Sequence, residues 1–152
     1  TKAAKKGETS MSNVQLMQAW LADLGKTLAS DYAFDENGVC TLAFDDDLCV
    51  SLTPSTADEA LFIVAGPVLA LSMDPAVDER LLKAALKLNF LGAETAGGSL
   101  ALSAYNGMLV FAHTLRFDDC DAVLLKNVIE NMADAIIRLR TEITSSLTGS
   151  AV

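Results

Sequence analysis

Apolar residues recur at helical spacing in three stretches of the chain, the first of which covers residues 12–29. Ser12 can cap this helix, and Leu16 and Trp20 lie beside its main apolar stripe. The combined apolar arc is wider than a helix on one sheet face needs, so Leu16 and Trp20 either pack at the core edge or form part of a docking surface. The stripe itself consists of Val14, Met17, Leu21, Leu24 and Leu28.

The second helical stretch has clear limits, because Asp74 suits an N-cap, Pro75 the first turn and Gly92 the C-terminal end. Apolar side chains surround most of its circumference, which predicts two apolar neighbours, its own sheet and a second subunit. The third stretch begins near residues 118–121, whose carboxylates favour a helix N-terminus, and residues 144–152 are expected to fray. Its stripe consists of Leu125, Val128, Ile129, Met132, Ile136, Leu139 and Ile143.

Five further stretches have the pattern of β-strands. They cover residues 39–44, 48–53, 60–71, 99–105 and 108–115. Three aspartates, 45–47, separate the first two and predict a solvated hairpin turn. Gly66-Pro67 interrupts the long apolar run 60–71 and predicts a bulge or bend, because proline cannot donate to a ladder. Asn106-Gly107 between the last two predicts a type I′ hairpin.

The predicted order is therefore α-β-β-β-α-β-β-α, an α+β domain with a mainly antiparallel, twisted sheet flanked by helices. The length of 152 residues suits one domain, which we expect at 12–147. Residues 1–11 carry three lysines without periodicity and are expected to be a disordered arm or the remnant of an expression tag. Residues 148–152 are expected to form a frayed tail.

Charge and composition restrict the partners. The chain has 20 acidic and 11 basic residues, a net charge of −9, and lacks the clustered Lys and Arg that a nucleic-acid partner requires. An acidic surface favours solubility and a basic partner segment. The longest apolar run, 60–71, is shorter than the ~20 residues that span a bilayer, so no membrane insertion is expected. Three cysteines without CxxC spacing predict reduced thiols in a cytoplasmic protein.

Candidate catalytic chemistry is sparse. His113 is the only histidine and lies in the middle of a predicted strand, and no metalloprotease, phosphate-loop or nucleophile-elbow motif is present. Cys120 lies near a helix start, where a thiol pKa can fall, but the aspartates beside it oppose this. Asp45, Asp46 and Asp47 lack the spacing of a calcium loop. We therefore expect no catalytic residue, metal or cofactor, and a protein that binds a partner without transforming it.

Several segments together give a resemblance to a known family. They are MQAWLADLG, VCTLAFDDDLCVSL, LFIVAGPVLAL, LLKAALKLNFLGA and SLALSAYNGMLVFAHTL. With the acidic charge and the element order, the chain resembles the class I type III secretion chaperones of Gram-negative bacteria over residues 12–147. The resemblance implies a cytoplasmic homodimer that holds an extended segment near the N-terminus of a secreted effector, with the secretion apparatus as a further contact. It implies no catalytic residue and no cofactor.

Two surfaces are expected to carry this binding. The first would lie on the first helix and the first hairpin, where an extended segment could add to a sheet edge and fill apolar pockets. Its candidate residues are Leu16, Trp20, Leu24, Phe34, Leu42 and Phe44, each of which could instead belong to the core. The second would be a self-complementary dimer interface. Its candidate residues are Leu82, Leu86, Leu100, Leu102 and Tyr105.

Two other functions stay open at this point. One is a cytoplasmic regulator of the same fold that sequesters a transcription factor or an anti-activator, and its partner would not be secreted. The other is an enzyme or a small-ligand carrier, which predicts a closed pocket and loss of an activity in a His113→Ala variant.

Overall fold

The computed structural model describes residues 12–28, 30–92, 95, 97–103 and 106–149. The expected arm at 1–11, the end of the tail at 150–152 and Tyr105 lie outside the described residues. The elements follow the predicted order, with a short 3₁₀ turn, Phe117–Asp119, before the last helix. They are α2 (Asn13–Leu28), β1 (Cys40–Asp45), β2 (Leu48–Pro54), β3 (Leu61–Ala70), α3 (Pro75–Leu91), β4 (Ser99–Leu102), β5 (Met108–Arg116) and α4 (Ala122–Gly149).

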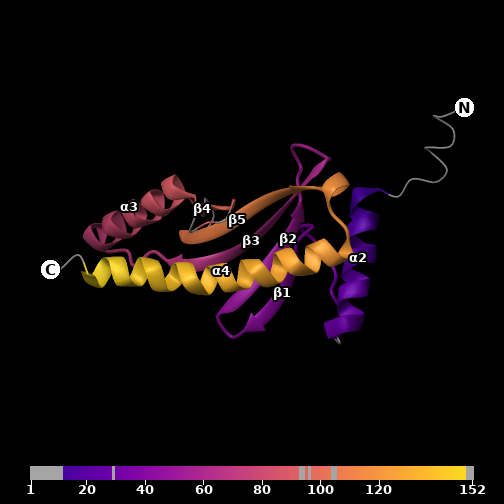
Figure 1. Ribbon diagram of the computed structural model, residues 1–152, viewed down its shortest axis with the longest axis horizontal. Helices are drawn as coiled ribbons and strands as arrows, with labels where there is room; N and C mark the ends of the chain where they lie inside the picture. Colours follow the sequence, from indigo (N-terminus) through magenta and orange to yellow (C-terminus); the bar gives the residue numbers. More distant parts are fainter. Residues whose placement is uncertain (1–11, 29, 93–94, 96, 104–105, 150–152) are drawn as a thin grey trace, which may run out of the picture.

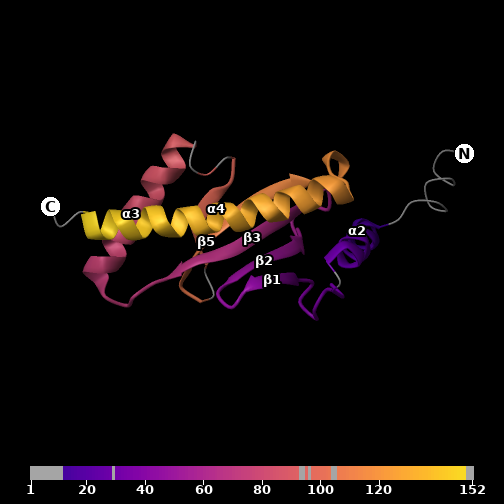
Figure 2. The same cartoon turned by 60° about the horizontal axis from the view of Figure 1, so that its bottom comes forward.

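The five strands form one antiparallel sheet in the order β1-β2-β3-β5-β4. Helix α4 runs along one face of this sheet, with α2 at one end of α4 and α3 near the other (Figure 1). In the turned view, no helix of the described chain covers the opposite face (Figure 2). The fold is therefore the predicted α+β arrangement, with helices concentrated on one side.

Local sequence signals explain where the helices begin and end. Ser12 and Gln15 cap α2 reciprocally: the Gln15 N–H donates to Ser12 Oγ at 3.1 Å and the Ser12 N–H donates to Gln15 Oε1 at 3.0 Å. Asp74 accepts from the Ala76 N–H at 3.0 Å, and α3 ends at Gly92, which has φ of 73°. Asp121 accepts from the Leu124 N–H at 2.7 Å at the start of α4.

The rotation of α2 about its axis differs from the predicted stripe. Its buried side chains are Met17, Trp20, Leu21 and Leu24. Val14 and Leu28, expected in the stripe, are 45% and 43% exposed, whereas the Trp20 ring lies 5.9 Å from Phe117 and 6.1 Å from Phe62. These two rings follow much later in the chain, and their stacking turns the helix towards Trp20.

The bend predicted at Gly66-Pro67 is confirmed, because the register between β3 and β5 shifts between Pro67 and Leu69. Gly66 is required at its place for packing. A Cβ there would lie 2.5 Å from the Cys49 carbonyl oxygen and 2.5 Å from Ile136 Cδ1. The missing side chain thus lets α4 approach the sheet closely, at the point where β3 bends.

Two local expectations were wrong. Asn106 is not among the residues of positive φ, although Gly107 has φ of 64°, so the turn is not type I′. Instead, Asn106 Oδ1 accepts from the Met108 N–H at 3.1 Å, and the strands part after Ser103, whose N–H bonds the Met108 carbonyl. Helix α4 also continues to Gly149, into the stretch expected to fray, and Leu147 in that stretch is half-buried against the core.

Candidate partner-binding surfaces

His113 lies half-buried on β5, beside a cavity of about 390 Å³ between that strand and α4. Phe111, Val128 and Met132 are among its apolar walls, and Asp134 lies on its α4 side. Over the described ranges, no group of three metal-ligating side chains is found. The search for a helix able to span a membrane, made on the described residues, also finds none.

Cys40 is buried and Cys120 is half-buried, and both thiols have a raised pKa. Burial raises the pKa of the Cys40 thiol, and the carboxylate of Asp35 raises it further. Burial likewise raises the pKa of Cys120, with a second contribution from Asp121, as the aspartates in the sequence suggested. A raised pKa disfavours the thiolate, so neither residue has the character of a nucleophile.

Most of the residues expected to form the first docking surface are buried or half-buried. Trp20, Leu24 and Leu42 are 7%, 5% and 1% exposed, so they belong to the core, the alternative that the sequence left open. Leu16 and Phe34 are half-buried against that core. Phe44 is 41% exposed and lies near the C-terminal end of β1, where the strand pairing shifts between Ala43 and Asp45. Of the six residues, only Phe44 is therefore exposed, and Leu16 and Phe34 are partly accessible.

A larger apolar surface lies on the sheet face that α4 leaves uncovered. Every strand pair contributes outward positions to this open sheet face, and β3 and β5 form its centre. Arg116, which pairs with Leu61 at one end of the face, is a charged outward position, and the outward positions between the strand ends are uncharged. They are Thr41, Ala43, Cys49, Ser51, Thr53, Ile63, Ala65, Pro67, Ala70, Ser99, Ala101, Met108, Val110, Ala112 and Thr114. A solvated sheet face normally carries polar residues, so this face has the composition of one that a partner covers.

Acidic turns lie at both ends of the open sheet face. Residues 45–47 form the turn between β1 and β2 at one end. Asp58 and Glu59, in the turn between β2 and β3, lie at the other end with Asp118 and Asp119, because Leu61 pairs with Arg116. A partner segment with an apolar middle and basic flanks would match this arrangement. The sequence did carry one signal of the face, since residues 60–71 are apolar at almost every position, as in strands covered on both sides.

The second expected surface lies on α3 and β4. Leu86 is 67% exposed and Leu102 is 49% exposed, whereas Leu82 is half-buried and Leu100, at 6%, belongs to the core. Phe90, which the sequence reasoning missed, is 90% exposed. Leu82, Leu86 and Phe90 follow one another at intervals of four, the spacing of neighbours on one helix face. That spacing was the signal that could have found Phe90.

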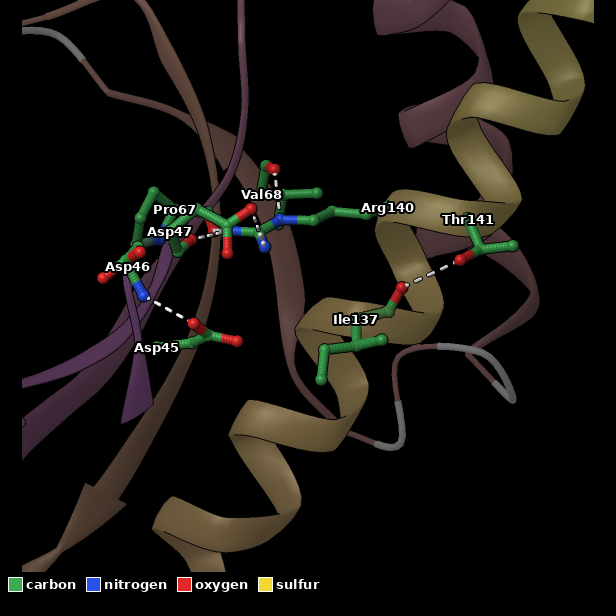
Figure 3. Close-up of polar contacts among 8 residues, drawn as sticks. All are labelled: Asp45, Asp46, Asp47, Pro67, Val68, Ile137, Arg140 and Thr141. Carbon is green, nitrogen blue, oxygen red and sulfur yellow. Dashed lines mark hydrogen bonds and ion pairs between the residues drawn. The ribbon is translucent and has the colours of Figure 1, made fainter. Parts of the chain in front are cut away.

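Polar contacts of Arg140 stabilise the bulge in β3 next to these surfaces. Arg140 on α4 reaches between the β1–β2 turn and the bulge in β3 (Figure 3). Its guanidinium donates to the carbonyl oxygens of Val68, Pro67 and Asp47, and it forms an ion pair of 3.6 Å with the Asp47 carboxylate. One side chain thus joins α4 to β3 and to the turn between β1 and β2.

An α+β domain with uncovered apolar surfaces and a free sheet edge has the architecture of a protein-binding module. A sequence profile of the Tir chaperone protein (CesT) family matches residues 19–140. The chain belongs to this family.

Solved structures share the fold at low sequence identity. A chain of the HopA1–SchA chaperone–effector complex is 20% identical, with a TM-score of 0.65 and coverage of 88% of this chain and 98% of that one. A chain of the ExsC–ExsE complex is 12% identical, with a TM-score of 0.71 and coverage of 86% and 96%. A chain of the ExoU–SpcU complex from the type III secretion system of Pseudomonas aeruginosa is 17% identical, with a TM-score of 0.57 and coverage of 82% and 95%. No curated protein sequence matches the chain.

Proposed function

We propose that this protein is a non-enzymatic type III secretion chaperone of the bacterial cytoplasm. It binds the N-terminal chaperone-binding segment of a secreted effector in extended form and keeps the effector soluble and competent for secretion. The observation that carries this proposal is the open sheet face, a surface rich in apolar side chains and uncharged except at Arg116, in a chain of the Tir chaperone family. Covering one large apolar side chain there contributes ~1.5–3 kcal/mol to partner binding.

Strand β1 offers the edge on which an extended segment can begin. It is the first strand of the sheet, and over the described residues no backbone hydrogen bond joins it to an element other than β2. An added strand would bond to the outer groups of β1 and place alternate side chains over the open sheet face. Phe44, which is exposed on this strand, would contact such a segment.

The proposed functional unit is a homodimer formed through α3 and β4. Leu86, Phe90 and Leu102 are exposed apolar side chains on these two adjacent elements, and Leu82 continues their stripe. A two-fold axis through this surface would place the stripe against its own copy, which buries apolar residues of both chains. Two open sheet faces, one from each protomer, would then be available to one effector segment.

A regulator that sequesters a transcription factor or an anti-activator would use the same surfaces. The fold shared with a chain of the ExsC–ExsE complex is compatible with this second function. The partner separates the two functions, because an effector leaves the cell through the secretion system and a regulator does not.

The test is capture from the native host with the wild-type protein and two matched variants. Ile63→Glu places a charge on the open sheet face, where Ile63 is 36% exposed, and Val123→Glu places the same charge on α4, where Val123 is 70% exposed. We expect Ile63→Glu to lose the partner and Val123→Glu to retain it, at equal thermal stability. Deleting the chaperone gene should then lower secretion of the captured protein. Equal capture by both variants, or a partner that is never secreted, would contradict the proposal.

A further inference from the structure

Asn89 on α3 bonds both backbone groups of one residue on the edge strand β4. The Leu100 N–H donates to Asn89 Oδ1 at 2.8 Å, and Asn89 Nδ2 donates to the Leu100 carbonyl oxygen at 2.9 Å. A primary amide carries an acceptor oxygen and a donor nitrogen side by side. It can therefore bond one residue's N–H and C=O together, as the backbone of a neighbouring strand does. Asn89 thus takes the place that a sixth strand would take.

The position of Leu100 in β4 means that the contact with Asn89 blocks pairing of a further strand at this edge of the sheet. β4 pairs only with β5 and is the last strand on its side of the sheet. In an antiparallel pair, the outward-facing peptide groups occur at every second residue, so Leu102 is the only other position of this four-residue strand that faces outward with Leu100. With Leu100 occupied, too little of the ladder remains for another strand to join.

The opposite edge has no comparable cap. Among the described residues, β1 has no backbone hydrogen bond to an element beyond β2. A sheet with two open edges can polymerise head to tail, because the last strand of one copy can join the first strand of the next. A sheet with one sealed edge cannot propagate in this way, whatever joins its free edge.

We propose that Asn89 is an edge cap that prevents β1 of a second copy from joining β4. It confines strand addition to β1 and leaves the α3–β4 surface to pair through its side chains alone. This inference rests on the proposed function, because it takes α3 and β4 to form the interface of the proposed dimer. The substitution Asn89→Ala removes both hydrogen bonds and exposes the Leu100 peptide groups.

The experiment measures solution mass by light scattering over a range of concentrations. We expect wild-type protein to keep one mass, and Asn89→Ala to shift to multiples of that mass as its concentration rises. Hydrogen exchange should show loss of protection at the Leu100 amide in dilute samples. Adding Thr41→Lys, a charge on the exposed edge strand β1, should return Asn89→Ala to the wild-type mass. Adding Val123→Lys on α4 should not.

A constant mass for Asn89→Ala with an unprotected Leu100 amide would overturn the edge cap, because the edge would be open and nothing would join it. If Asn89→Ala loses its cooperative thermal transition, Asn89→Ser takes its place, since a hydroxyl is too short to reach both peptide groups. A constant mass for that variant would overturn the proposal equally. A monomeric wild-type protein would instead contradict the proposed dimer, and the comparison between wild type and Asn89→Ala would still test the cap.

Discussion

The Nε atom of Arg140 donates a hydrogen bond of 2.8 Å to the carbonyl oxygen of Val68, within the bulge of β3. Nη2 of the same guanidinium donates to the Pro67 carbonyl at 3.1 Å (Figure 3). A bulge leaves carbonyl groups without a ladder partner, and a buried carbonyl without a partner is costly. Arg140 therefore stabilises the bend that the chain needs where α4 passes Gly66.

Replacing Arg140 with methionine should lower the free energy of unfolding by about 2–3 kcal/mol. The substitution keeps an unbranched apolar stem but leaves the two β3 carbonyls without their charged donor, and hydrogen bonds to charged groups contribute about 1.5–3 kcal/mol. Urea unfolding measures the change. Asp47→Asn is the control, because it removes only an ion pair whose carboxylate is 84% exposed, a loss of about 0–1 kcal/mol. Equal effects of the two variants would show that the bulge does not depend on Arg140.

Trp20→Ala should cost about 3–5 kcal/mol of stability, because the ring is buried between Phe62 and Phe117 and its removal leaves a cavity. Phe44→Ala, an aromatic truncation at a 41% exposed position, is the matched control and should change stability much less. Chemical denaturation of both variants measures the difference. If Trp20→Ala kept wild-type stability and lost partner binding, the docking role considered for Trp20 from the sequence would hold instead.

The elements were predictable because their signals are local. Asp74, Pro75 and Gly92 mark α3 with residues that act within one turn, and Gly66-Pro67 marks a bend by what proline lacks. The rotation of α2 was not predictable, because it depends on Phe62 and Phe117, which follow Trp20 by many residues and meet it only in the fold.

The candidate surfaces were less predictable, because contacts between residues far apart in the sequence decide them. The apolar run at 60–71 indicates a strand with two apolar faces, but only the path of α4 decides which face stays open. In the sequence, Arg140 is simply a positive charge near the end of a helix. Its contact with Val68, which is 72 residues away in the chain, is seen only in the fold. Asn89 is uncharged and lies in one of the segments that carry the family resemblance, but only the placement of β4 beside α3 shows what its amide does.

Leu86→Asp with Phe90→Asp should shift the proposed dimer to monomer. The two side chains are 67% and 90% exposed in the protomer, so charges at these positions leave the core unchanged but oppose each other and lose apolar contact across a two-fold interface. Light scattering after size exclusion measures the mass. Ile137→Asp, on α4 at 50% exposure, is the control and should leave the mass unchanged. An unchanged mass for the double variant would remove α3 from the interface.

Asp78 should make stability depend on pH in a narrow acidic window. The Ser72 N–H donates to its carboxylate at 2.7 Å, and the Ser72 hydroxyl and the Met73 N–H donate as well. The backbone hydrogen bond from Ser72 is the main reason that the pKa of Asp78 lies below its ordinary value of 3.8. Because the folded state lowers this pKa, the stabilisation is complete above about pH 3.8 and is lost as the pH falls through the lower, folded-state value.

Wild type should therefore be more stable than Asp78→Asn at neutral pH, and the gap should close as the pH falls below the ordinary pKa of the carboxyl. Thermal unfolding at a series of pH values measures the gap. Glu79→Gln is the control, because Lys83 lowers the pKa of Glu79 through an exposed ion pair of 2.9 Å. Salt should weaken the Glu79 effect by screening and leave the Asp78 effect in place, because backbone N–H groups hold that carboxylate. A gap for Asp78→Asn that is constant with pH would show that these hydrogen bonds do not depend on the charge.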